Sequence, residues 1–173
     1  TPERIFKDYR YLSSTSSTFL EHAERFVEEC IKENRLSKKD WVLEIASNDG
    51  YLLQWFVKKG IPVLGIDPAA NCSEVAAEKG VRTEVKFFGE KTALEIASKY
   101  GKANLLLGNN VLAHVPDIKD FVAGFEVLLQ DEGVATFEFP HVLNLLDTVQ
   151  FDTIYHEHFC SLSLLACEPI FKR

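Results

Sequence analysis

The densest group of titratable residues is Tyr155-His156-Glu157-His158, near the end of the sequence. Histidine titrates near neutral pH, so His158 is a candidate general base. Two histidines at positions i and i+2 of a strand also share one face and could bind a metal, although no third dedicated ligand is apparent. A polar surface turn is the plain alternative. We expect acid–base chemistry here and no bound metal.

The second candidate group is the loop of residues 44–50, which follows an apolar strand and precedes a helix. The acidic Glu44 and Asp49 would repel a pyrophosphate. They would suit S-adenosylmethionine, which carries an ammonium and a sulfonium but no phosphate. An ordinary strand–helix turn is the alternative for this loop. Dinucleotide-binding proteins have a GxGxxG fingerprint here, and in this chain its glycine positions hold Ala46, Asn48 and Gly50.

Further polar residues follow two other expected strands. Asp67 ends the second strand, where a carboxylate can accept both hydroxyls of an adenosine ribose, and a helix N-cap before Pro68 is a compatible role. Asn109 and Asn110 follow the fourth strand and could face a ligand, although loop asparagines often make turns. His114, shortly after them, could equally be a core histidine.

Strands and helices alternate along the chain, which predicts right-handed crossovers and a parallel sheet. An amphipathic helix is expected over 18–33, and Thr18 with Glu21 fits a capping box at its start. Glycine is expected to end the helices, and Asp131-Glu132-Gly133 is expected to turn into the last strand. The strands are expected at 41–46, 62–66, 81–85, 103–107 and 134–139, and the later helices at 51–59, 70–79, 90–100, 118–129, 142–150 and 164–173.

Ligands of an open parallel sheet bind beyond the carboxyl ends of its strands. The candidate residues of the first two strands and of the fourth strand lie at such ends. The architecture therefore predicts that the site is formed by the loops that begin at Glu44, Asp67, Phe87, Gly108 and Glu138.

The composition disfavours several classes of protein. The chain has 173 residues, 46% hydrophobic content and a net charge of −7, which suits a domain with a real core and disfavours nucleic-acid binding. No apolar run approaches the roughly 18–20 residues that span a bilayer, and the first residues form no signal peptide. Four cysteines without a CxxC pair fit reduced thiols in the cytoplasm. The absence of methionine predicts that Thr1 is not the natural start.

A family resemblance runs over nearly the whole chain and is carried by the segments VLEIASNDGYLL, GIDPAAN, GNNVLAHVPDI, EFPH and QFDTIYHEHF. The chain resembles the S-adenosylmethionine-dependent sugar C-methyltransferases of deoxysugar biosynthesis. These enzymes act on nucleotide-linked 4-keto sugars and release S-adenosylhomocysteine. The resemblance implies an α/β fold, a Rossmann-like class I methyltransferase core with a mostly parallel sheet and helices on both faces.

The resemblance also implies how the chain is divided. Residues 1–38 would be an N-terminal extension and a helix packing on the core. Residues 39–173 would be the S-adenosylmethionine-binding methyltransferase domain, incomplete at its C-terminal end. A zinc module before this truncated core and a further lobe after it are expected outside the segment.

The resemblance implies a set of site residues as well. In the implied mechanism His158 removes the acidic proton α to the ketone, and His114 and Tyr155 polarise the ketone oxygen. Glu157 would orient the histidine, and the resulting enolate would attack the methyl group. The cofactor would be held by Glu44, Ala46, Asn48, Gly50, Asp67, Phe88 and Asn109. The sugar would be bound by Tyr9, Tyr11 and His141, and catalysis would involve His158, Glu157, Tyr155 and His114.

Two alternatives to this function stay open. A methyltransferase of the same fold could act on another small molecule, above all if the terminal cluster is structural. A non-catalytic module that retains the cofactor fold is the alternative from a different class. A dehydrogenase is disfavoured by the acidic first loop and by the missing GxGxxG fingerprint.

Overall fold

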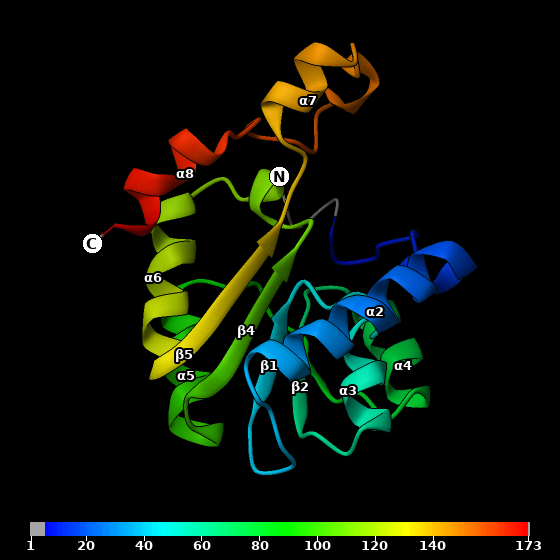
Figure 1. Cartoon of the computed structure of the whole chain (residues 1–173), viewed down its shortest axis with the longest axis vertical. Helices are drawn as coiled ribbons and strands as arrows, with labels where there is room; N and C mark the ends of the chain where they lie inside the picture. Colours follow the sequence, from blue (N-terminus) through cyan, green and yellow to red (C-terminus); the bar gives the residue numbers. More distant parts are fainter. Residues whose placement is uncertain (1–5, 173) are drawn as a thin grey trace.

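The computed structural model describes residues 6–172 and shows a five-stranded parallel sheet with helices on both faces (Figure 1). The strand order is β3-β2-β1-β4-β5, so β1 lies at the centre. The strands are β1 (Val42–Ile45), β2 (Val63–Ile66), β3 (Thr83–Glu84), β4 (Ala103–Asn109) and β5 (Leu129–Glu138). The predicted α/β fold class is confirmed. Residues 1–5 of the predicted N-terminal extension, and Arg173, lie outside the described residues.

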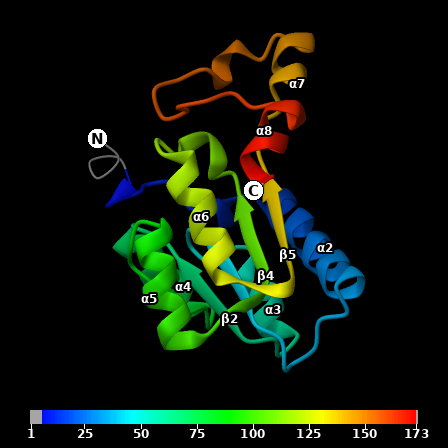
Figure 2. The ribbon, with the colours of Figure 1, turned by 90° about the vertical axis from the view of Figure 1, so that its left-hand side faces the viewer.

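Helices α2 and α3 pack on one face of the sheet together with Val42, whereas α5 and α6 pack on the other face with Leu43 (Figure 2). Successive side chains of a strand point to opposite faces, so Glu44 lies on the face that α2 and α3 cover. The helices are α2 (Ser17–Glu33), α3 (Leu53–Lys58), α4 (Ala70–Glu78), α5 (Glu90–Tyr100), α6 (Ile118–Leu128), α7 (Val142–Asp147) and α8 (Leu164–Phe171), and the short 3-10 helices are η1 (Ser13–Thr15), η2 (Leu112–His114) and η3 (Phe151–Thr153).

Helix α2 begins one residue earlier than predicted. Ser16 is its N-cap, and the Ser16 hydroxyl accepts a hydrogen bond from the N–H of Phe19 at 3.3 Å. The predicted capping box of Thr18 with Glu21 is therefore wrong. Several hydroxyl residues precede the helix and each is able to cap it. Long-range hydrogen bonds that hold η1 decide which of them occupies the capping position.

The last strand is longer than predicted because it starts at Leu129, directly after α6. Ala103 pairs with Leu129, but Leu105 pairs with Val134, so residues 130–133 form a bulge rather than the predicted turn. The predicted glycine ends are confirmed for three helices by the left-handed backbone of Gly60, Gly80 and Gly101.

The turn from β1 to α3 has a left-handed backbone at three positions, with φ of 57° at Ala46, 48° at Asn48 and 73° at Gly50. These are the glycine positions of the dinucleotide fingerprint, so the tight turn survives with a single glycine. At Gly50 a Cβ atom would lie 3.1 Å from Val81 and 3.2 Å from Ala76. Gly50 is therefore needed for close packing, and Ala46 holds a conformation that costs an alanine roughly 1–2 kcal/mol.

The chain after β5 forms an arm at the carboxyl end of the sheet, where α7 stands away from the core (Figures 1 and 2). Large apolar side chains of this arm are exposed, among them Leu146 at 66%, Phe151 at 72% and Leu165 at 79%. None of the helices within residues 6–172 combines the length and the apolar character that crossing a bilayer requires.

We expect Ala46→Gly to raise the free energy of unfolding by about 0.5–1 kcal/mol, because relief of the left-handed strain outweighs the added freedom of the unfolded chain. Urea denaturation measures this change. Ala97→Gly is the matched control. Ala97 lies within helix α5, so replacing it by glycine should lower the free energy of unfolding by about 1 kcal/mol. Destabilisation of equal size in both variants would contradict the assigned strain.

Candidate functional site

A cavity of about 630 Å³ opens at the carboxyl ends of the strands. Its walls come from the turn after β1, the ends of β2 and β4, the loop before α5, η2, and two segments at opposite ends of the chain. The predicted site residues that line it are Tyr9, Tyr11, Ala46, Asn48, Asp67, Phe88, Asn109, His114, Tyr155 and His158. The predicted residues absent from its lining are Glu44, Gly50, Glu157 and His141.

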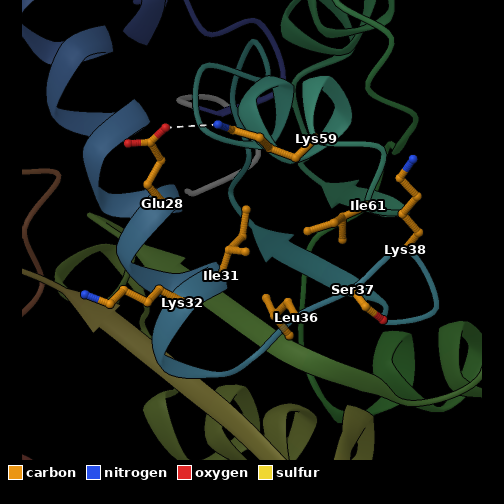
Figure 3. A pocket seen from close by; sticks show the side chains of 8 residues that line it. All are labelled: Glu28, Ile31, Lys32, Leu36, Ser37, Lys38, Lys59 and Ile61. Carbon is orange, nitrogen blue, oxygen red and sulfur yellow. Dashed lines mark hydrogen bonds and ion pairs between the residues drawn. The ribbon is translucent and has the colours of Figure 1, made fainter.

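A second hollow, of about 530 Å³, lies at the opposite end of the sheet, before β1 and β2 (Figure 3). Its apolar floor includes Ile31 and Ile61, and Lys59 pairs with Glu28 across its rim at 2.9 Å. The lining has no histidine, tyrosine or aspartate. Its charged residues are Glu28 and three lysines, whereas two of the predicted histidines and the predicted tyrosines line the first cavity, where we place the functional site.

The carboxyl group of Glu44 is buried outside the cavity lining and has no hydrogen-bond partner at either oxygen within residues 6–172. Burial, together with the nearby Asp67 and Asp49, raises the pKa of Glu44 well above its usual value. The Oδ1 atom of Asn109, which lines the cavity, is likewise buried and unpartnered within those residues. A buried carboxylate and a free amide oxygen suit a bound cation such as an ammonium group.

Asp67 lies at the end of β2 and is 6% exposed. Its Oδ2 accepts the N–H of Asn48 and its Oδ1 accepts the N–H of Ala69, both at 2.8 Å. Each oxygen keeps a second lone pair, so the carboxylate can still accept hydroxyl groups from the cavity. Burial raises the pKa of Asp67, and the two backbone donors oppose that rise.

Asp49 has a different role from the one expected of its charge. Its side chain is fully buried outside the cavity lining, and its Oδ2 pairs with Lys79 Nζ at 2.9 Å. The N–H and the hydroxyl of Ser14 also donate to this oxygen. Because Lys79 neutralises Asp49, the expectation that Asp49 faces a cofactor is wrong. Glu44 also lies outside the cavity lining, but, unlike Asp49, it has no hydrogen-bond partner at either oxygen within residues 6–172.

His114 and His158 form the polar centre of the opposite wall, with ring centroids 4.8 Å apart. His114 Nδ1 donates to the carbonyl of Glu157 at 3.0 Å, and His158 Nδ1 donates to the carbonyl of Thr153 at 2.8 Å. A carbonyl oxygen only accepts, so both rings carry a proton on Nδ1, and in the neutral form Nε2 can accept one. Burial and the neighbouring His158 lower the pKa of His114.

Two tyrosines complete this wall. The ring centroids of Tyr155 and His158 are 4.4 Å apart. Burial and the nearby Glu157 raise the pKa of Tyr155. Burial, with Glu157 as a smaller cause, raises the pKa of Tyr9 to about 12. Both phenols therefore stay protonated at neutral pH and can donate hydrogen bonds to a ligand oxygen.

The structure places two other predicted residues away from the cavity. Glu157 orients His114 through its backbone carbonyl, while its carboxylate lies 3.9 Å from His156 Nε2. His141 caps α7 by accepting the N–H of Leu143. His156 has a side chain 78% exposed, and within residues 6–172 no trio of histidine, cysteine or acidic side chains is arranged to hold a metal ion.

The sequence patterns missed other residues of the cavity. Tyr51 is buried in its wall and stacks on Phe19, with ring centroids 5.0 Å apart. Phe6 contributes from the N-terminal segment, and Lys86 and Asp120 contribute charge at the rim. The position of Tyr51 directly after the glycine loop is a signal that could have found it. The other residues are brought in by the fold.

The model of the methyltransferase domain family matches residues 19–173. C-methyltransferase NovU of Streptomyces niveus is 38% identical over 171 residues, which cover 99% of this chain and 41% of that protein. The chain thus spans about two fifths of the length of this relative.

Solved structures share the fold at low sequence identity. PH0226 protein of Pyrococcus horikoshii OT3 gives a TM-score of 0.75 at 14% identity, over 98% of this chain and 86% of that one. A SAM dependent methyltransferase of Archaeoglobus fulgidus gives a TM-score of 0.66 at 14% identity, over 91% and 73%.

We expect Lys79→Met to lower the free energy of unfolding by about 3–5 kcal/mol, because it leaves the buried Asp49 carboxylate unpaired. Lys59→Met is the matched control, since the pair of Lys59 with Glu28 is solvent-exposed and is worth at most about 1 kcal/mol. Urea unfolding of the two variants measures the difference. Equal losses would contradict the role given to Lys79.

We expect Glu44→Gln to change how stability depends on pH. With its raised pKa, folded Glu44 keeps a proton that the unfolded chain has lost, so unfolding becomes easier as pH rises above the usual range of a glutamate, about 4.3. The glutamine variant lacks this decline and should be more stable than the parent at neutral pH. Unfolding measured from about pH 5 to 8 tests this.

Glu84→Gln is the control of opposite sign. Hydrogen bonds from Lys99 and Tyr100 lower the pKa of Glu84, so the stability that this group contributes is present at neutral pH and is lost as pH falls. The Glu84→Gln variant should be less stable than the parent at neutral pH. A Glu44→Gln variant that behaves in the same way would show that Glu44 is ionised in the folded protein.

Proposed function

The chain belongs to the methyltransferase domain family, and from this we propose that it transfers the methyl group of S-adenosylmethionine to a carbon atom of a nucleotide-linked keto sugar. The observation that carries this proposal is the wall of two histidines and two tyrosines. Forming a carbon nucleophile needs a base for a C–H proton and donors for the oxygen that becomes negative. The name of the relative NovU, a C-methyltransferase, supports the same chemistry.

The side of the cavity formed by Asp67 and Asn109, at the ends of β2 and β4, fits the cofactor. The unpartnered oxygens of Glu44 and Asn109 suit its ammonium group, and Glu44 would give up its proton when this cation binds. Asp67 retains lone pairs for ribose hydroxyls. When bound, S-adenosylmethionine supplies an electrophilic methyl group. We propose that the cofactor is held by Glu44, Ala46, Asp67, Phe88, Asn109 and the backbone at Asn48, with Gly50 shaping the turn.

We propose His158 as the base. Its Nδ1–H is held by the carbonyl of Thr153, so Nε2 can take the proton α to the ketone. The C–H electrons then form the enolate double bond, and negative charge develops on the ketone oxygen. Tyr155 and Tyr9 can donate hydrogen bonds to that oxygen. The proton on His158 is later released to water.

His114 suits the task of a second base better than that of a donor. Its proton is committed to the carbonyl of Glu157, and its lowered pKa keeps the ring neutral. Polarising the ketone, the task implied by the family resemblance, would need a second proton on this ring. We therefore propose the tyrosines for that task. We also propose a role in deoxysugar biosynthesis and a cytoplasmic location, in keeping with the four free cysteines.

We expect His158→Asn in the full-length protein to lower methyl transfer by about 10²–10⁴-fold, because the base is lost. The affinity for S-adenosylhomocysteine should stay nearly unchanged, since the base faces the acceptor. The variant should also stop exchange of the α-proton of the keto sugar into deuterated water, a step that needs no methyl donor. Mass spectrometry of the sugar measures this exchange.

His114→Asn is the matched variant. Exchange that survives in His158→Asn and vanishes in His114→Asn would assign the base to His114. Exchange that survives in both single variants and in the double variant would show that neither ring is the base, and the alternative of another small-molecule acceptor would then be favoured. His156→Asn should leave exchange unchanged because that ring is exposed outside the cavity lining.

A further inference from the structure

The N-terminal segment, residues 6–15, forms one wall of the cavity without belonging to the sheet. Phe6, Tyr9, Tyr11 and Ser13 line the cavity from this segment. Tyr9 and His114 both contact the ring of Phe6, at centroid distances of 5.7 Å, so this wall continues into the histidine cluster. The position of the segment therefore decides the shape of the part of the cavity that we assign to the acceptor.

Side chains of the core hold this segment by its backbone. Asn48 Nδ2 donates to the carbonyl of Tyr11 and Asn48 Oδ1 accepts the N–H of Ser13, both at 3.0 Å. Asn71, in the first turn of α4, donates to the carbonyl of Tyr9 at 2.8 Å and accepts the N–H of Tyr9 at 3.2 Å. These two amides fix the residues that carry both tyrosine rings of the wall.

Asn48 combines this contact with one to the opposite wall. The backbone N–H of Asn48 donates to Asp67 Oδ2 at 2.8 Å. The partners of its side chain in the N-terminal segment, Ser13 and Tyr11, precede Asn48 by 35 and 37 positions in the sequence. The backbone bond to Asp67 needs only the left-handed turn, which glycine adopts readily. The side-chain bonds need asparagine. The two contacts can therefore be separated by a single substitution.

We infer that the side chain of Asn48 is a positioning residue for the acceptor: it fastens the N-terminal segment over the cavity, while its backbone alone serves the cofactor side. Asparagine at a glycine position of the fingerprint thus sets the acceptor wall. The effect on the acceptor rests on the proposed function, whereas the attachment of the N-terminal segment by Asn48 does not.

The test is Asn48→Gly in the full-length protein, a variant that keeps the turn and removes the amide. The two hydrogen bonds to the segment are lost, together with a local one from the Asp49 N–H to Asn48 Oδ1, so amide hydrogen exchange of residues 9–14 should become about tenfold faster. The KM for the keto sugar should rise about tenfold for the same reason. The Kd for S-adenosylhomocysteine, measured by calorimetry, should change less than about threefold, because the bond to Asp67 survives.

Asn71→Ala should reproduce the faster exchange around Tyr9, since it releases the same segment from a different element. Asn34→Ala is the control, because Asn34 binds the carbonyl of Cys30 at the end of α2 and should affect neither readout. Unchanged exchange at 9–14 in Asn48→Gly would overturn the inference. So would a loss of S-adenosylhomocysteine affinity as large as the rise in KM.

Failure of the proposed function is distinguishable from failure of this inference. If the parent protein takes no keto sugar as substrate, the proposed function falls. The exchange and calorimetric measurements use no acceptor, so faster exchange with an unchanged Kd would still support the fastening role of Asn48, and the opposite pair of results would overturn it.

Discussion

The left-handed turn after the central strand β1 is the constraint on which the site depends. Three of its five residues from Ala46 to Gly50 have positive φ. This path brings the backbone of Asn48 to Asp67 on the neighbouring strand and sends its side chain to the N-terminal segment. It also buries Asp49 beside Lys79. One turn thus joins β2, α4 and the start of the chain around a single cavity.

Much of the fold could be predicted because its signals are local. Short apolar runs marked the strands, and the glycines after α3, α4 and α5 marked helix ends. The prediction failed where the local sequence fitted more than one structure and contacts with distant residues determined which of them formed. The bulge of β5 at residues 130–133 has the composition of a turn, but pairing with β4 keeps it in the strand. Ser16 caps α2 because η1 is held by side chains more than 30 positions away.

The candidate site was predictable in position and less so in roles. The carboxyl ends of parallel strands had to meet, and the family resemblance supplied the histidines and tyrosines. The charge of Asp49 gave no indication that Lys79 neutralises it, because that contact joins two separate elements. Glu157 was expected to orient a histidine, and in the structure its backbone carbonyl accepts from His114 Nδ1. Every residue has such a carbonyl, so the type of side chain gave no indication of this contact.

The buried pair of Asp49 and Lys79 also has an evolutionary consequence. Loss of Lys79 first leaves the fully buried Asp49 as an isolated charge, so position 79 cannot drift before position 49 without a loss of stability. Substitutions at the two positions should covary among homologous sequences. A homologue that lacks both would lose the contacts to Ser14 and would hold its N-terminal segment through the side chains at positions 48 and 71. The pair is therefore a marker for subdividing the lineage.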